Sequence, residues 1–188
     1  MSDEFDIPPT IENTKTPTLI HPQVSSRLHG HTLVSVSSRS HRWIIDEPEH
    51  KGSTDLGPTP LESLLGSLVG CESVVLKLVA KAIGFEFTDL TLTCTGTADM
   101  RGARGVKGVR PYFTTVDMVI EIETDESEKR LELLRRNVEQ RCPVMNLFES
   151  ADVEMNVIWK TGSRQQGAAG PAFRPPIPRA TPRRPAPF

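Results

Sequence analysis

The longest apolar segment of the chain, LLGSLVGCESVVLKLVAKAIG, predicts a helix. The helix is expected to begin at Pro60, because Thr59, Pro60 and Glu62 form a capping box with proline in the first turn. Gly84 is the kind of residue that ends a helix. We therefore expect one long helix over 60–83.

The remaining pattern predicts strands and two further helices. Alternating apolar and polar residues predict strands at 31–38, 41–46, 85–99, 113–125 and 152–160. An apolar stripe of Leu131, Leu134 and Val138 predicts an amphipathic helix over 126–141, and a short helix is expected over 143–150. Strands and helices in this order indicate an α+β fold.

Composition places the fold between two polar tails. Residues 1–20 are polar and contain proline, and 162–188 are rich in Pro, Arg, Ala and Gly, so both are expected to be disordered around one domain at 21–161. The formal net charge of −2 gives no general attraction to nucleic acid or to anionic membranes. The N-terminus lacks a signal-peptide pattern, and Lys77 and Lys81 interrupt the best candidate for a membrane span, so we expect a cytoplasmic protein.

The chain has three cysteines, a number that fits a reducing compartment better than a disulfide scaffold. It allows one reactive pair and one bystander. Cys94 lies within a predicted strand among threonines, which makes it the bystander. Cys71 lies inside the long helix, where a cysteine without a partner is more often an inert core thiol than a nucleophile.

The long helix has two different sides at 100° per residue. Small or polar residues form one stripe: Ser63, Gly66, Ser67, Gly70, Lys77 and Lys81. Bulky residues form the other: Leu64, Leu65, Leu68, Val75 and Val79, with Glu72 among them and Cys71 at the border. One side is expected to face the domain's own sheet. The other is suited to the close approach of a second helix, which suggests a dimer.

A second cysteine provides a possible partner for Cys71. Cys142 precedes Pro143, so it is expected to cap a helix, where free N–H groups and the helix dipole lower the pKa of a thiol. A buried structural cysteine at a helix start remains the alternative. Two interpretations of Glu72 also remain open. Its side chain either reaches solvent at an interface or has a cationic or hydrogen-bonding partner.

Two segments, GPTPLESLLGSLVGCESVVLKLVAKAIGFEFTDL and RCPVMNLFESADVEMNVIW, resemble the OsmC/Ohr superfamily. The segments GTADMRG and VEQRCPV are similar to the OsmC-like branch typified by YhfA rather than to Ohr proper. The resemblance covers roughly 28–160. It implies an OsmC-like fold, with antiparallel sheets around two central helices in an intertwined homodimer.

The resemblance also implies a thiol peroxidase that reduces organic hydroperoxides in oxidative stress defence. Cys71 would attack the peroxide and become a sulfenic acid, and Cys142 would resolve it to a disulfide. A dithiol reductant, of lipoyl type in the Ohr relatives, would restore both thiols. An arginine held by a glutamate stabilises the thiolate in the family, and Arg39 is the matching candidate, with Arg42 and Arg27 behind it.

The glutamate is the point at which this chain departs from Ohr proper. The family position ten residues before the cysteine is Leu61 here, and Glu62 follows it. Glu62 and Cys71 would face opposite sides of one helix, roughly 13 Å apart along its axis. Glu62 would thus act across a dimer or only as a cap, and Glu72 is the alternative partner for the arginine.

No feature of the sequence predicts a cofactor or metal site. His29 and His31 share a strand face without a second ligand pair, and the glycine-rich basic segment 101–110 lacks the ending of a phosphate-binding loop. The alternative to a peroxidase is a non-enzymatic OsmC-like protein that binds a small hydrophobic ligand or a protein partner.

Overall fold

The computed structural model describes residues 16–163. Of the predicted disordered segments, 1–15 and 164–188 lie outside the described residues, while Gly162 ends β6. The elements are β1 (Ser25–Leu28), β2 (Val34–Ser38), β3 (His41–Ile45), the 3-10 helix η1 (Glu49–Lys51), α1 (Pro60–Ile83), β4 (Asp89–Ala98), α2 (Met100–Ala103), β5 (Phe113–Glu123), α3 (Glu128–Arg141), α4 (Pro143–Ser150) and β6 (Glu154–Gly162).

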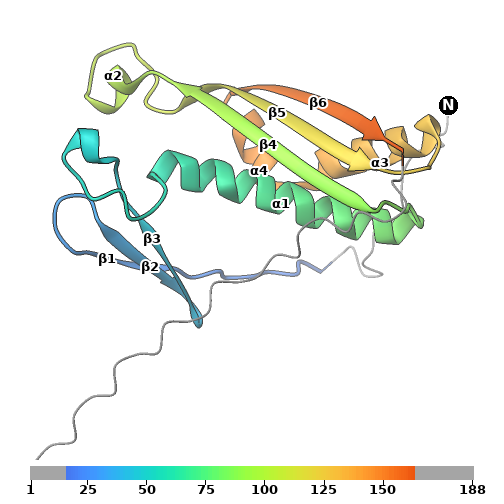
Figure 1. Ribbon diagram of the computed structural model, residues 1–188, viewed down its shortest axis with the longest axis horizontal. Coiled ribbons are helices and arrows are strands. Elements are labelled where there is room, and N and C mark those ends of the chain that lie inside the picture. Colours follow the sequence, from blue (N-terminus) through green and yellow to red (C-terminus); the bar gives the residue numbers. More distant parts are fainter. Residues whose placement is uncertain (1–15, 164–188) are drawn as a thin grey trace, which may run out of the picture.

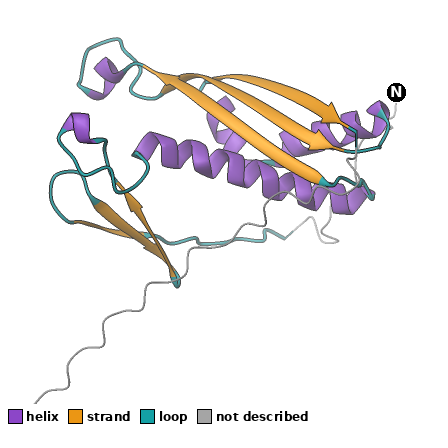
Figure 2. Ribbon diagram, in the orientation of Figure 1, coloured by secondary structure: helices purple, strands orange, loops and turns teal. Residues whose placement is uncertain are grey.

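Two layers make up the larger part of the molecule. The helices α1, α3 and α4 cover one face of the sheet β4–β5–β6, as Figures 1 and 2 show. The three-stranded sheet β1–β2–β3 stands apart, near the N-terminal end of α1 (Figure 1). The mixture of helix and sheet confirms the predicted α+β class.

The larger sheet corrects one part of the expectation. β4 pairs with β5 in antiparallel fashion, but β5 pairs with β6 in parallel, so this sheet is mixed. The cause is the connection: α3 and α4 lie between β5 and β6 and carry the chain back across the sheet, as a parallel neighbour requires. The smaller sheet is antiparallel throughout.

The long helix has the predicted bounds and the predicted cap. The Thr59 side chain accepts a hydrogen bond from the Glu62 N–H at 3.2 Å, and the Thr59 N–H donates to Glu62 Oε2 at 2.7 Å. Gly84 ends the helix in the left-handed region, with φ 64°, which glycine adopts without a steric cost. The sequence analysis did not predict β1, whose four residues are all exposed and show no apolar alternation.

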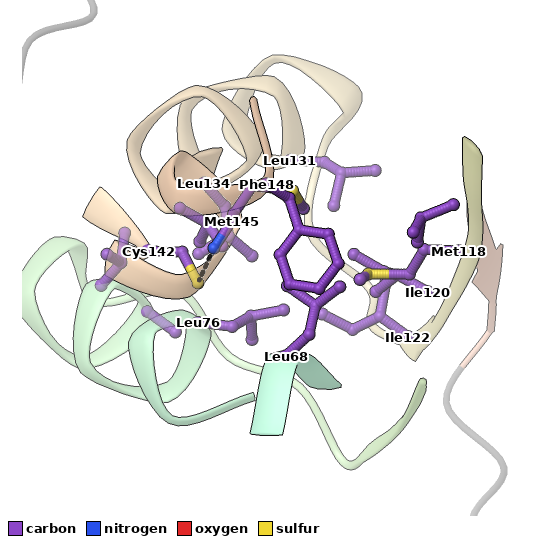
Figure 3. Packing of buried hydrophobic residues seen from close by; sticks show 14 of the residues in the cluster. Leu68, Leu76, Met118, Ile120, Ile122, Leu131, Leu134, Cys142, Met145 and Phe148 are labelled. Carbon is purple, nitrogen blue, oxygen red and sulfur yellow. Dashed lines mark hydrogen bonds between the residues drawn. The ribbon is translucent and has the colours of Figure 1, made fainter. Parts of the chain in front are cut away.

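The core lies between the helices and the larger sheet. Figure 3 shows leucines of α1 and α3, together with Met145 and Phe148 of α4, packing against apolar residues of β5. Phe148 stacks on Phe113, with ring centroids 6.1 Å apart. This packing fixes the junction of α3 and α4 above the middle of α1, which is where the two candidate cysteines meet.

The opposite face of α1 is open in this chain. Val74 and Leu78 are 59% and 62% exposed, and a Cβ built on Gly66 or Gly70 would meet no atom within 4 Å. Leu64, a member of the bulky stripe, is also 44% exposed. The small-residue side is thus uncovered within this chain and carries exposed apolar side chains as well, and its contact with a second helix stays a prediction.

By length and composition, α1 could also cross a membrane, which corrects the expectation drawn from Lys77 and Lys81. A helix in the core of a globular domain meets the same criterion. The inner face of α1 has that role here, because Leu68, Leu76 and Val79 are buried against the rest of the domain.

Candidate active site

Cys142 lies where α3 ends and α4 begins. It is fully buried, and Pro143 occupies the first position of α4. Its Sγ accepts a hydrogen bond from the Met145 N–H at 3.5 Å, drawn as the dashed line in Figure 3. The predicted helix-capping position is therefore confirmed.

The predicted lowering of the Cys142 pKa is wrong. Burial and the adjacent Glu72 carboxyl together raise the pKa of this thiol to about 12. The Met145 N–H acts in the opposite direction but does not compensate. The sequence showed the cap, but it did not show that the thiol would be sealed from water between α1, α3 and α4.

Cys71 is a neighbour of Cys142. It lies in the middle of α1 and is partly buried, and its thiol interacts with the Cys142 thiol. Both are free cysteines. The structure thus brings together two residues separated by more than seventy positions, and the more accessible of them is the one proposed to meet peroxide.

Glu72 completes the cluster. It is fully buried, and neither carboxylate oxygen has a hydrogen bond of regular geometry within residues 16–163, although the Cys142 thiol is its neighbour. Burial raises the pKa of Glu72, and the negative charges of Glu139 and Glu149 add to this effect. The interpretation as a glutamate that reaches solvent does not hold within this chain.

Glu62 has a structural role. Its carboxylate caps α1, and the hydrogen bonds to Thr59 lower its pKa. In this helix it lies nine residues before Cys71, on another face, and no contact between the two is found among the described residues. A catalytic role for Glu62 stays a prediction that depends on a second copy of the chain.

Arg39 lies in the turn between β2 and β3, with φ 54° and an exposed side chain. Neither Arg39 nor the reserve candidates Arg42 and Arg27 makes a hydrogen bond or ion pair with Cys71 or Glu72 in the part of the chain that the structure describes. The hairpin that carries Arg39 stands away from the middle of α1 (Figure 1). Its role at the thiol stays a prediction.

An apolar hollow of about 200 Å³ lies between α1, α4 and the start of β5, and neither Cys71 nor Cys142 is among its lining residues. Its lining comes from α1, α4 and the start of β5, namely Leu64, Tyr112, Phe113, Val144, Leu147, Phe148, Ala151 and Val153. Leu64 precedes Cys71 by two helical turns on the same face, and Val144 follows Cys142 by two residues. The hollow suits the hydrocarbon part of a small molecule. The sequence analysis missed it because its lining comes from distant segments.

The sequence analysis also missed Asp46, a fully buried carboxylate at the end of β3. Its hydrogen-bond donors are the hydroxyls of Thr32, Ser53 and Thr54 and the backbone N–H groups of Glu47 and Leu56. They hold the loop between β3 and α1 against the strand. An isolated aspartate directly after an apolar strand, followed by Ser53 and Thr54, was the available signal.

The other cysteine and the histidine considered for chemistry have structural contacts. Cys94 faces inward from β4, and burial raises its pKa, as does the charge of Asp117. His29 Nε2 is hydrogen-bonded to Ser35 Oγ at 2.7 Å. Residues 16–163 contain no group of three or more His, Cys, Asp or Glu arranged to hold a metal ion.

The sequence model of the family described as OsmC-like protein matches residues 51–157, which is more than half of the chain. Among curated proteins, none matches the sequence significantly.

Solved structures share the fold. An OsmC-like protein from Mycoplasma pneumoniae is 22% identical, with a TM-score of 0.65 over 76% of this chain and 97% of that one. A Legionella pneumophila protein described as organic hydroperoxide resistance protein OsmC is 14% identical (TM-score 0.56, 77% and 98%). The organic hydroperoxide resistance protein OhrB of Bacillus subtilis is 18% identical (TM-score 0.53, 76% and 100%). At these identities the likeness shows the fold alone.

Proposed function

Because the chain belongs to the family of OsmC-like proteins, we propose that it is a thiol-dependent peroxidase that reduces organic hydroperoxides through Cys71 and Cys142. The match to the family model confirms the membership that the two cysteine motifs predicted. The observation that carries the proposal is the meeting of the Cys71 and Cys142 thiols. An apolar hollow lined by Leu64 of α1 and Val144 of α4, the two helices involved, supports it. Two proteins of similar fold are described as organic hydroperoxide resistance proteins, which supports the same chemistry.

The reaction needs two steps at the cysteines. The Cys71 thiolate attacks the terminal oxygen of the hydroperoxide, the O–O bond breaks, and an alkoxide leaves and takes up a proton. Cys71 is then a sulfenic acid. The Cys142 sulfur attacks the Cys71 sulfur and releases water, and a dithiol reductant of lipoyl type exchanges with the resulting disulfide to restore both thiols.

The apolar hollow favours a hydroperoxide with a hydrocarbon substituent. Leu64, Val144 and Leu147 would cover the alkyl or aryl part of the substrate, while the peroxide group reaches the partly buried Cys71. Burial of apolar surface contributes roughly 25 cal/mol per Å², so a cumyl or tert-butyl group would bind better than hydrogen peroxide. We accordingly expect organic hydroperoxides to react faster than hydrogen peroxide.

We include a homodimer in the proposal. The uncovered apolar face of α1 suits a second copy of the same helix, and the separate β1–β3 sheet leaves room for the two chains to interlock. In that assembly the hairpin of one chain would carry Arg39 to the thiol of the other and stabilise the thiolate and the leaving alkoxide.

The test is loss of titratable thiol on addition of cumene hydroperoxide. The wild-type protein is expected to lose Cys71 and Cys142 together, whereas Cys71→Ser should keep its remaining thiols. Cys94→Ser is the matched control and should react as the wild type does. Unchanged thiol titration in the wild type would contradict the peroxidase.

A binding protein is the second candidate, and the apolar hollow is the observation that favours it. In that case the protein would bind a fluorescent fatty acid saturably, and Leu64→Arg would weaken binding, while hydroperoxide left every thiol reduced. Catalytic turnover of hydroperoxide in the presence of a dithiol would instead support the peroxidase.

A further inference from the structure

We infer that Glu72 is the base that takes the thiol proton of Cys142 when Cys142 attacks oxidised Cys71. The inference rests on the proposed two-cysteine cycle and adds to it a group that carries the proton. It replaces the expectation that Glu72 anchors an arginine.

The first support is the position of Glu72. Its carboxyl is fully buried and lacks a regular hydrogen bond in the described part of the chain, and it lies beside the fully buried Cys142 thiol. An unpaired carboxyl in such a place costs several kcal/mol, so its presence in the core calls for an explanation other than stability. No arginine or lysine side chain forms an ion pair with it within residues 16–163.

The second support is what Cys142 needs. A thiolate, not a thiol, attacks sulfur, and the raised pKa of Cys142 keeps its sulfur protonated at pH 7. Water cannot easily serve as the base, because the thiol is sealed in the core. The Met145 N–H holds the sulfur and stabilises charge on it but cannot accept its proton.

The third support is the set of charges around Glu72. The groups that face it are Cys142, Glu139 of α3 and Glu149 of α4, and Cys71 is its neighbour on α1. Burial and the two glutamates raise the pKa of Glu72, which makes its carboxylate a better proton acceptor than an exposed glutamate. Cys71 and Glu72 are successive residues of one helix, about 100° apart around its axis. Both side chains interact with Cys142, so the base and the oxidised sulfur are within its reach.

The step balances in atoms and electrons. The Cys142 S–H bond breaks and its proton passes to the Glu72 carboxylate, while the Cys142 sulfur forms a bond to the Cys71 sulfur. The S–O bond of the sulfenic acid breaks, and the hydroxide that leaves takes the proton back from Glu72 as water. A sulfenic acid and a thiol thus become a disulfide and water, and Glu72 ends as it began.

The test separates the two steps in the wild type and in Glu72→Gln. Cumene hydroperoxide is added, sulfenic acid at Cys71 is trapped with dimedone, and disulfide formation is followed by mass spectrometry. Glu72→Gln is expected to form sulfenic acid at the wild-type rate but to close the disulfide about 10²-fold more slowly, the lower end of what general-base catalysis contributes. Glu154→Gln, on the exposed edge strand β6, is the matched control and should behave as the wild type.

The pH profile distinguishes a base from a structural residue. Closure in the wild type should rise with pH as Glu72 ionises and then level off, whereas in Glu72→Gln it should keep rising with hydroxide toward the pKa of Cys142. Glu72→Asp keeps a carboxylate and should recover part of the rate and the plateau. If the glutamine side chain of Glu72→Gln disturbs the fold, Glu72→Asp still tests the inference.

The outcomes that overturn the inference differ from those that overturn the function. Absence of dimedone-reactive Cys71 in the wild type would remove the peroxidase, and the inference with it. Normal sulfenic acid formation together with wild-type closure and pH profile in Glu72→Gln would overturn the inference alone. A defect confined to sulfenic acid formation would do the same and return Glu72 to the role of arginine partner.

Discussion

Glu72 and Asp46 are both fully buried carboxyl groups, and their surroundings move their pKa values in opposite directions. Burial raises the pKa of each. At Asp46, hydrogen bonds from Ser53, Thr54 and two backbone N–H groups outweigh burial and hold the pKa well below its usual range. At Glu72 the neighbouring Cys142 thiol also lowers the pKa, but it does not outweigh burial. Asp46 is therefore a structural anion, and Glu72 is a group poised to exchange a proton.

The unfolding free energy of Glu72→Gln should show this difference. The folded pKa of Glu72 lies above its unfolded value of 4.5, so the folded state holds the proton longer and the wild type loses stability as pH rises from 4.5 through the folded pKa. The variant lacks this loss. The free energy of unfolding of the variant should match that of the wild type near pH 4. At pH 8 it should be higher than that of the wild type, by about 1.4 kcal/mol for each unit by which the pKa of Glu72 is raised. Urea denaturation at both pH values measures this, and equal pH dependence in the two proteins would contradict it.

Element boundaries followed from the sequence where local chemistry determines them. The capping box at Thr59 and the glycine at 84 fixed α1 at both ends, and Cys142–Pro143 fixed the start of α4. Features that depend on contacts between segments far apart in the sequence could not be predicted in this way. The parallel pairing of β6, the raised pKa of Cys142 and the apolar hollow each arise where segments far apart in sequence meet.

The loop between β3 and α1 depends on one carboxylate, and Asp46→Asn should loosen it. The folded pKa of Asp46 lies below its unfolded value of 3.8, so its contribution to stability is present above that pH and is lost as pH falls through the folded pKa. The variant should melt at a lower temperature than the wild type at pH 7, and the gap should narrow below pH 4. Asp89→Asn, an exposed aspartate at the start of β4, is the control. A gap that is constant with pH would show that the charge is not responsible.

At the scale of the whole molecule, the two faces of α1 have different surroundings. Its inner face is built into the core, yet only 28% of its most apolar 18-residue window is buried within the chain. The outer face combines Val74 and Leu78 with Gly66 and Gly70, where no side chain keeps a neighbouring helix away. Exposed apolar surface of this kind marks an interaction site, and a second copy of α1 fits it because the same small residues would allow both helices to approach closely.

Val74→Arg combined with Leu78→Arg should therefore separate the proposed dimer. Two arginines on each helix would lie against like charges and would lose solvent on association, which costs several kcal/mol. Sedimentation equilibrium should give twice the chain mass of 20.8 kDa for the wild type and the single-chain mass for the variant. Ile158→Arg is the matched control, because Ile158 is equally exposed, at 56%, but lies on the strand β6 of the larger sheet. If the control dissociates and the α1 variant does not, the chains associate through the sheet. A single-chain mass for the wild type would instead mean that the outer face of α1 is covered by something other than a second copy.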